Sequence, residues 1–427
     1  MNITILTYGS RGDVQPFVAL ALGLQKNGHV VKLAAPHKFD EFVTSHGVSF
    51  IPLAGDPEEI SRLINNAGTN PVRVVASMWK YIFSVAPQVS RAAFAACEGA
   101  DLIIHSFLFT VGGHSWAHEH NIPDVSVQTF PMFAPTRDFP NVAAPIVPPG
   151  ALSYFSHWFA TQIFWYGGNG GDRPARRAYP DIQYPKKLYW PFEDRPHHLR
   201  TPLLFAYSPS ILPRPSDWGE HVHVTGYFFL DEEAYQPPND LIKFLAAGDL
   251  PICISFGSMV NRKAERIDQI IRDALKQTNN RGVILSGWGG IMNHSSKDLL
   301  YLESAPHDWL LPRCRMIIHH GGAGTTSAGL RAGIPNVVVP FTADQPFWGN
   351  RVNAIGVGPK LILVKNISVE KLTHAIIEAE SSTVCGRAQF VGQRIRSECG
   401  VEDAVALIET YSLDFRTKAE SDVQGGE

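Results

Sequence analysis

Short apolar runs alternate with amphipathic segments along the chain, beginning at its second residue. In the first half these runs are rich in β-branched residues and nearly continuous in hydrophobicity, as is typical of strands in a parallel sheet covered on both faces. Apolar residues at helical spacing fill the gaps, notably at 14–27 and 71–97. The pattern predicts an α/β fold. Strands are expected at 2–8, 30–36, 48–53, 101–106, 124–129 and 203–208.

The alternation stops between residues 130 and 200, where prolines and aromatic residues dominate, and it resumes after the proline-containing segment 208–220. Ligands of such sheets bind at the carboxyl ends of the strands. We therefore expect two facing Rossmann-like βα domains with a cleft between them. The second set of strands is expected at 221–226, 251–257, 281–287, 315–320 and 334–341, with helices at 263–277, 323–333, 345–355 and 367–380.

These patterns predict where the domains begin and end. An N-terminal domain is expected over 1–212, and a C-terminal domain over 213–385. Two helical runs within 386–414 are expected to pack back on the N-terminal domain. The polar tail 415–427 has the composition of a disordered segment.

Composition and charge narrow the classes of partner. The 427 residues carry a formal net charge of −3 and are 44% hydrophobic, which fits a soluble globular protein without a basic field for nucleic acid. Five widely spaced cysteines without a C-x-x-C motif argue against a zinc site or a disulfide framework. No apolar run reaches the ~20 residues of a membrane span, and the N-terminus lacks the features of a signal peptide. We expect a cytoplasmic protein without a cofactor; peripheral membrane contact and the oligomeric state stay open.

The stretch RMIIHHGGAGTTSAGLRAG at 315–333 joins a strand end to a glycine-rich turn and a helix. Glycines let backbone N–H groups approach an anion, and the first turn of a helix offers unpaired donors and a partial positive charge. The turn has neither the lysine of a Walker A loop nor the spacing of a G-x-G-x-x-G fingerprint. It suits a pyrophosphate group, with His320 as an added donor. A tight turn that binds no ligand is the alternative.

Polar and aromatic residues follow other strands that are expected in the same sheet. Asp344 and Gln345 come just past the last of these strands, and a carboxylate beside an amide suits the hydroxyl groups of a sugar. Ser258 follows a second strand, and Trp288, which is available to stack on a base, follows a third. Because these strand ends share one edge of the sheet, the four residues are expected to converge on one crevice.

These stretches resemble the family 1 nucleotide-sugar glycosyltransferases of GT-B fold, and more narrowly the branch of sterol glucosyltransferases and microbial antibiotic and lipid glycosyltransferases. The resemblance covers essentially the whole chain, from GSRGDVQP at 9–16 to PFTADQPFWGNR at 340–351. It implies an inverting, metal-independent transfer of a hexose, with UDP-glucose as the expected donor. By the same resemblance, the N-terminal domain is expected to bind the acceptor and the C-terminal domain the nucleotide sugar. The donor-binding residues expected from the sequence and this resemblance are Ser258, Trp288, His307, His320, Gly322, Gly324, Thr325, Asp344 and Gln345.

The catalytic base differs from that of the plant members of the family, whose histidine base and W-x-P-Q segment are absent here. The resemblance gives the role to Asp13, which would take the proton of an acceptor hydroxyl while the oxygen attacks the anomeric carbon. This role requires a free lone pair and some loss of solvation, which would raise the pKa of Asp13. The alternative is that Asp13 is the N-cap of the helix that follows it, where Pro16 fits the first turn. The two roles can coexist, with one oxygen each. Arg11 is expected to be a solvated or loop-bracing residue rather than a phosphate ligand.

The aromatic and proline-rich region 130–165 is the candidate acceptor site. A lipophilic acceptor such as a sterol, a hydroxylated lipid or a polyketide-like aglycone is expected to contact Phe130, Phe133, Phe139 and Trp158, although packing in the N-terminal core is the alternative. His114 and His118 are spaced to chelate a metal ion on a helix, but no third ligand is evident and no D-x-D pair occurs. A UDP-sugar epimerase or hydrolase, or a non-catalytic lipid-binding relative, stays open as another function.

Overall fold

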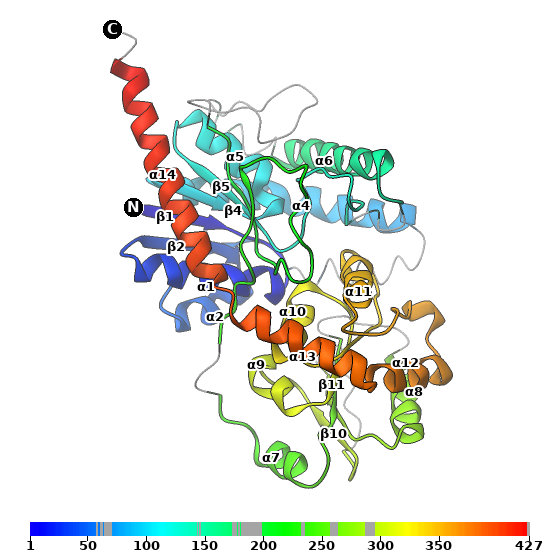
Figure 1. Ribbon diagram of the computed structural model, residues 1–427. Coiled ribbons are helices and arrows are strands. Elements are labelled where there is room, and N and C mark those ends of the chain that lie inside the picture. The colour runs from blue at the N-terminus through cyan, green and yellow to red at the C-terminus, as the bar shows by residue number, and fades with distance from the viewer. Residues whose placement is uncertain are drawn as a thin grey trace. The chain divides into compact units, whose positions relative to one another are not determined.

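The computed structural model divides the chain into two compact units. The N-terminal unit contains Met1–Pro209, Pro213–Leu230 and Cys399–Glu427, and the C-terminal unit contains Ser210–Leu212 and Asp231–Glu398. Each unit is built on a parallel sheet, as the sequence predicts (Figure 1). The structure describes residues 1–56, 71–142, 147–172, 199–231, 235–256, 264–286 and 295–424, and the single positions 59, 63, 144, 177 and 180.

The N-terminal unit contains a seven-stranded sheet in the order β3-β2-β1-β4-β5-β6-β7. Its central strands are paired in register, so that Leu6 at the end of β1 lies between Ala34 of β2 and His105 of β4. The carboxyl ends of these strands therefore meet at one edge. The strands are β1 (Asn2–Leu6), β2 (Val30–Pro36), β3 (Ser49–Leu53), β4 (Leu102–His105), β5 (Asp124–Gln128), β6 (Leu203–Phe205) and β7 (Val222–Val224).

Alternating side chains of this sheet enter two separate cores, because successive residues of a strand point to opposite faces. Ile3 and Ile5 pack with α1 and α14 on one face, whereas Leu6 and Ile103 pack with α4 and α5 on the other. Both faces are thus covered, which explains the near-continuous hydrophobicity of the strands. The helices are α1 (Arg11–Lys26), α2 (Asp40–Ser45), α4 (Pro71–Cys97), α5 (Thr110–Glu119), α6 (Ala151–Asp172) and α14 (Gly400–Gln424), with 3-10 turns η1 (His37–Phe39) and η2 (Phe107–Phe109).

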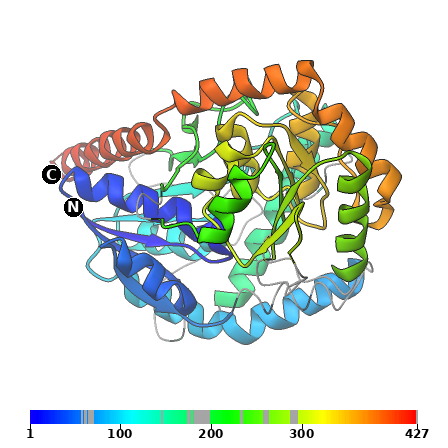
Figure 2. The same ribbon diagram turned by 90° about the horizontal axis from the view of Figure 1, so that it is seen from below.

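The last helix, α14, packs directly on α1, as Figure 2 shows. Gly23 permits this approach, since a Cβ atom at this position would lie 2.5 Å from Val401 Cγ1. Phe415 is buried, so the apolar contacts of the helix continue into the segment expected to be disordered. The helix extends to Gln424, and the disorder expected for the tail is wrong over 415–424. Residues 425–427 lie outside the described part of the chain.

The C-terminal unit contains a five-stranded sheet in the order β10-β9-β8-β11-β12. Ile252 and Ile254 of β8 pack with α8 and α12 on one face, and Cys253 packs with α7 and α9 on the other. The strands are β8 (Ile252–Ser255), β9 (Gly282–Leu285), β10 (Leu299–Leu302), β11 (Met316–His319) and β12 (Asn336–Val338). The helices are α7 (Asn239–Ala246), α8 (Ala264–Gln277), α9 (His307–Leu310), α10 (Ala323–Ala332), α11 (Gln345–Ala354), α12 (Val369–Ala379) and α13 (Ser382–Arg396), with 3-10 turns η6 (Leu311–Arg313) and η7 (Val364–Asn366).

The division between the units differs from the predicted boundary at residue 212. The segment 221–226, expected to open the second domain, contains β7, which pairs with β6 in the N-terminal sheet. The chain passes to the C-terminal unit after Leu230. Of the two terminal helical runs, α13 belongs to the C-terminal unit and α14 to the N-terminal unit. No helix among the described residues is long and apolar enough to cross a membrane.

Candidate functional site

The turn after β1 brings a carboxylate to the carboxyl edge of the N-terminal sheet. Gly9 has a φ of +145°, and a Cβ atom at this position would lie 2.3 Å from Asp13 Oδ2. A side chain would therefore be strained in its backbone and would also displace the carboxylate. Glycine at position 9 allows Asp13 to fold back over the turn.

Asp13 is the third residue of α1, and Ser10 is the N-cap, so the predicted N-cap position of Asp13 is wrong. The carboxylate nevertheless completes a capping box, in which Oδ2 accepts hydrogen bonds from Ser10 N at 2.7 Å and Ser10 Oγ at 2.9 Å. Thr7 Oγ1 donates to the Asp13 carbonyl at 2.7 Å and fixes the backbone. Oδ1 accepts no hydrogen bond from any described residue. Oδ2 therefore serves the helix cap, and Oδ1 is the oxygen that can accept a hydrogen bond from a substrate.

The surroundings of Asp13 favour proton transfer. Burial raises the pKa of the Asp13 carboxyl, and the two hydrogen bonds from Ser10 act in the opposite direction. The net result is a pKa above the ordinary value, which strengthens the carboxylate as a base. Arg11 does not approach the carboxylate in this arrangement: it donates from Nε to Gln15 Oε1 at 3.0 Å and lies over the Phe42 ring at 4.7 Å. This agrees with the bracing role expected for Arg11.

The C-terminal unit presents the glycine-rich turn between β11 and α10. Gly321 has a φ of +91°, which favours glycine, and its N–H donates to His319 Nδ1 at 3.1 Å. Gly322 is the N-cap of α10, and a Cβ atom there would lie 2.5 Å from His320 Nε2. The imidazole of His320 thus lies over the turn. The bracing role of His319 was not predicted from the sequence.

The first turn of α10 offers donors to an anion. It contains no acidic side chain. The N–H groups of Ala323, Gly324 and Thr325 lie at the start of the helix, where no carbonyl oxygen of the helix is available to accept from them. The Thr326 and Ser327 hydroxyls donate back to the carbonyl oxygens of the turn at 2.9 and 2.7 Å. The Thr325 hydroxyl has no hydrogen-bond partner among the described residues. Gly324 and Thr325 are therefore the positions at which a ligand finds available polar groups.

His320 is neutral at pH 7. Burial lowers its pKa to about 4, and the nearby His307, the first residue of α9, adds to the effect. Its Nδ1 atom is buried without a hydrogen-bond partner in the described part of the chain. A neutral imidazole supplies one N–H donor and no net charge. His307 and His320 thus lie near each other, and their part in binding a donor stays a prediction.

Asp344 and Gln345 open α11 immediately after the β12 strand and its loop. Asp344 Oδ2 accepts from Trp348 Nε1 at 3.0 Å. Gln345 is buried, and its Oε1 accepts from Phe341 N at 2.8 Å and Thr342 N at 3.1 Å. These bonds hold the two side chains in fixed positions at the start of the helix.

The strand register brings these loops together. His319 at the end of β11 pairs with Val338 of β12 and with Ser255 of β8, so the segments that follow all three strands leave from one edge. The shared edge of these strands agrees with the sequence, and the convergence of the predicted residues on one crevice stays a prediction. The predicted donor residues Ser258 and Trp288 lie outside the described residues.

The predicted acceptor residues belong to three aromatic groups of the N-terminal unit. Phe130 lies 4.9 Å from the Phe107 ring, and Phe133 lies 6.2 Å from Phe164. Phe139 lies 5.8 Å from the His157 ring, and Trp158 lies 5.7 Å from the Phe155 ring, in two further groups. Phe130, Phe133 and Phe139 are buried, and only Trp158 is partly exposed. The structure therefore places three of the four rings in the protein interior.

Of the two histidines spaced to chelate a metal ion, His114 instead belongs to a buried network with Asp124. His114 Nδ1 and His105 Nε2 both lie 2.9 Å from Asp124 Oδ2, and Thr201 donates to Oδ1 at 3.1 Å. Although burial alone would raise it, the pKa of Asp124 is held well below its usual range by the two histidines. No cluster of possible metal ligands occurs in the described part of the chain.

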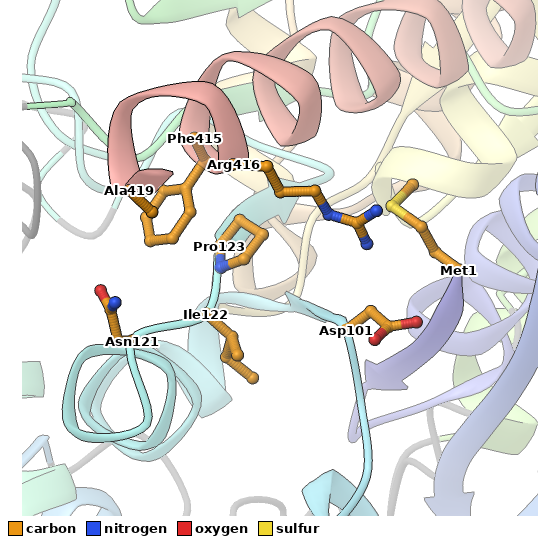
Figure 3. Close-up of a pocket in the computed structure, with 8 residues that line it drawn as sticks. All are labelled: Met1, Asp101, Asn121, Ile122, Pro123, Phe415, Arg416 and Ala419. Atoms are coloured by element: carbon orange, nitrogen blue, oxygen red, sulfur yellow. The ribbon is translucent and has the colours of Figure 1, made fainter. Parts of the chain in front are cut away.

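A surface hollow of about 410 Å³ lies at the opposite edge of the N-terminal sheet (Figure 3). Asp101 precedes β4, and its carboxylate accepts from Asn2 N at 2.7 Å. The hollow is thus at the amino ends of the strands, away from Asp13. It is lined by Met1, Asp101, Asn121, Ile122, Pro123, Phe415, Arg416 and Ala419.

Solved structures with the same fold are glycosyltransferases of the GT-B class. The calicheamicin glycosyltransferase CalG4 covers 96% of this chain, with 97% of its own length aligned, a TM-score of 0.69 and 17% identity. The spinosyn forosaminyltransferase SpnP gives a TM-score of 0.68 at 14% identity, over 97% of this chain and 99% of that one. At these identities the likeness defines the fold.

Sequence comparisons define the family. Residues 3–137 match the glycosyltransferase family 28 N-terminal domain, and residues 297–398 match the erythromycin biosynthesis protein CIII-like C-terminal domain. The sterol 3-beta-glucosyltransferase UGT80A2 of Arabidopsis thaliana is 36% identical over 428 residues, covering 95% of this chain and 64% of the relative. UGT80B1, from the same plant, is 33% identical over 416 residues, covering 95% and 67%. The chain belongs to the sterol glucosyltransferase family.

The chain is shorter than these relatives. It spans about two thirds of the length of the two plant proteins. The sterol 3-beta-glucosyltransferase of the fungus Sclerotinia sclerotiorum is 33% identical over 427 residues, which cover 96% of this chain and 29% of the relative.

Proposed function

We propose that this chain transfers glucose from UDP-glucose to a hydroxyl group of a lipophilic acceptor of the sterol type, with inversion at the anomeric carbon and without a metal ion. The acceptor class and the sugar are motivated by the relatives, which are named sterol 3-beta-glucosyltransferases.

The observation that carries the proposal is the arrangement of the Asp13 carboxylate. Oδ2 is held by both donors of Ser10, whereas Oδ1 receives no hydrogen bond from the described residues. In the proposed step the acceptor hydroxyl gives its proton to Oδ1 as its oxygen bonds to the anomeric carbon. The bond from that carbon to the phosphate oxygen breaks, and UDP leaves with the electron pair. The raised pKa of Asp13 supports this role.

The C-terminal unit is proposed to bind the donor. The turn after β11 supports diphosphate binding, because helix N-terminal N–H groups stabilise the charge that develops on the leaving UDP. His320, which is neutral, can donate one hydrogen bond without adding charge. Asp344 and Gln345 are proposed to hold sugar hydroxyls, with Trp348 fixing the orientation of the carboxylate.

The proposal is tested with the purified chain, UDP-glucose and a panel of sterols, hydroxylated lipids and polyketide-like alcohols in the presence of EDTA. The expected product is a sterol carrying one added hexose, detected by mass, with a β-glucosidic linkage in its NMR spectrum and one UDP released per product. Release of UDP at the same rate without any acceptor would instead identify a hydrolase. An α-linked product would contradict inversion, and loss of turnover in EDTA would contradict metal independence.

A further inference from the structure

Helix α6 carries its apolar side chains on the outside. Its large outward-facing residues recur at intervals of three or four, which places them along one face of the helix. Their exposed fractions lie between 45% and 61%. We call this set the α6 stripe, and it consists of Leu152, Phe155, Phe159, Ile163 and Tyr166.

The opposite face of α6 is buried, and apart from Ala160 and Trp165 its buried side chains are polar. Ser156 Oγ accepts from Asn141 N at 2.9 Å, and His157 Nε2 lies 3.1 Å from the Phe139 carbonyl oxygen. Burial lowers the pKa of His157 to about 4, so this face carries no charge at neutral pH. A surface helix of a water-soluble protein has the reverse arrangement, with the apolar stripe inward and polar residues outward. The inversion indicates that the outer face of α6 meets an apolar medium. The buried polar residues are Ser153, Ser156, His157, Thr161 and Gln162.

The stripe contains no charge that would oppose such contact. Residues 151–166 include no Asp, Glu, Lys or Arg. Aromatic residues with one polar end, such as Tyr166 and the partly exposed Trp158, prefer the boundary between hydrocarbon and water. Figure 1 shows α6 beside α4 in the N-terminal unit, and α4 adds the exposed Phe83.

The shape and area of the α6 stripe distinguish between a small molecule, a second protein copy and a lipid surface as its binding partner. The stripe runs for about 21 Å along a convex helix, whereas a small-molecule site is a concavity that encloses most of its ligand. Its exposed apolar area is on the order of 600 Å², because a large side chain can bury roughly 150–250 Å² and these are about half exposed. A stable dimer buries about 800 Å² per partner. A lipid surface needs no such matching area.

We propose that the α6 stripe docks this chain on the surface of a lipid bilayer, with α6 lying in the plane of the interface. No described helix can span the membrane, so the contact is peripheral. The inference that the bilayer also supplies the lipophilic acceptor rests on the function proposed above. The docking itself requires neither donor nor acceptor and is measured without them.

The test is co-sedimentation of the whole chain with sterol-free phosphatidylcholine vesicles. Phe155→Ser combined with Phe159→Ser is expected to lower the partition coefficient by at least about tenfold, because each change removes an inserted ring. The matched control is Ile377→Ser combined with Phe390→Ser, which removes similarly exposed apolar residues from α12 and α13. It is expected to bind like the unaltered chain. Phe155→Leu with Phe159→Leu is expected to retain most of the binding.

Four results would overturn the proposal. The first is that the unaltered chain fails to sediment with these vesicles. The second is that the stripe variant sediments as well as the control at an unchanged melting temperature. Binding that requires sterol in the vesicles would assign the stripe to acceptor recognition. A dimer that the stripe variant converts to a monomer, measured by light scattering, would assign it to a second copy. Transfer to a sterol delivered in cyclodextrin tests the proposed function separately, so the two can fail independently.

Discussion

The backbone N–H of Ser10 donates to Asp13 Oδ2 at 2.7 Å, and the hydroxyl of the same serine donates to the same oxygen at 2.9 Å. One residue thus satisfies one oxygen twice. Oδ2 of the carboxylate caps α1, whereas Oδ1 keeps the lone pair that a base needs. This relationship makes Ser10 a positioning residue for Asp13.

Replacing Ser10 with alanine removes one of these two bonds. Because hydrogen bonds from Ser10 lower the pKa of Asp13, their loss raises it, and the acidic limb of the kcat profile is expected to move to higher pH. The carboxylate also loses one of the two bonds that orient it, so we expect kcat to fall by about tenfold despite the higher pKa, with little change in the KM for UDP-glucose. Stability is expected to fall by about 1 kcal/mol through the lost cap. Ser10→Thr, which keeps the hydroxyl, is expected to restore kcat and stability. An unshifted pH profile in Ser10→Ala would contradict the positioning role.

Gly9→Ala tests the close approach of the turn to the carboxylate. The positive φ and the 2.3 Å separation of the added Cβ atom from Asp13 Oδ2 predict a loss of about 1–3 kcal/mol in unfolding free energy and a loss of turnover. Gly12→Ala is the control, since its Cβ atom would come no closer than 3.7 Å to Ser10 Oγ and alanine favours the helix. Denaturant unfolding and turnover are compared for both. Equal stability of the two variants would show that the turn at Gly9 tolerates a side chain.

Gly322→Ala tests the proposed diphosphate site. The new Cβ atom would lie 2.5 Å from His320 Nε2 and would push the imidazole away from the turn. We expect UDP to bind about tenfold more weakly in titration calorimetry, as for the loss of one hydrogen bond to a charged group. The control is Gly386→Ala on α13, where a Cβ atom meets nothing within 4 Å. Undiminished UDP affinity in Gly322→Ala would remove His320 from the site.

Asp124→Asn tests the buried histidine–aspartate network. The two histidines hold the pKa of Asp124 well below its usual range, so its stabilising contribution is present above about pH 4 and is lost as the pH falls through the lowered folded-state pKa. We expect the variant to lose about 3 kcal/mol at pH 7 and the difference from the unaltered chain to shrink in acid. Asp414→Asn, at an exposed position of α14, is the control. A difference that is constant from pH 7 to pH 2 would contradict the linkage.

Local hydrophobic patterns predict most strands and helices of the fold, whereas the remaining assignments depend on pairing between distant segments. The runs that became β1, β2 and β11 are apolar and β-branched, so their periodicity alone predicted them. Val222–Val224 reads as the start of a new alternation, and only its pairing with β6 assigns it to the first sheet. The polar tail near Phe415 reads as disordered because packing of α14 against the N-terminal unit is not visible in composition.

The candidate site was predicted unevenly for similar reasons. The spacing of Ser10 and Asp13 is that of a capping box, a signal available in the sequence that would have placed the cap at Ser10. The contacts of His319 and Trp348 depend on strand register and helix geometry, which residue types alone do not give. The inversion of α6 was hidden because its aromatic residues are spread around the helix, and only burial distinguishes its faces.

The central claim is that Asp13 is the base, and the Asp13→Asn variant tests it most directly. Asparagine keeps the shape of the side chain and an oxygen that can accept from Ser10, but it cannot take a proton. Initial rates of sterol glucoside formation are measured beside UDP affinity in the same preparation. We predict a fall in turnover of at least about a hundredfold with UDP affinity unchanged. Turnover within about twofold of the unaltered chain, well short of the smallest effect expected for a lost general base, would contradict the account.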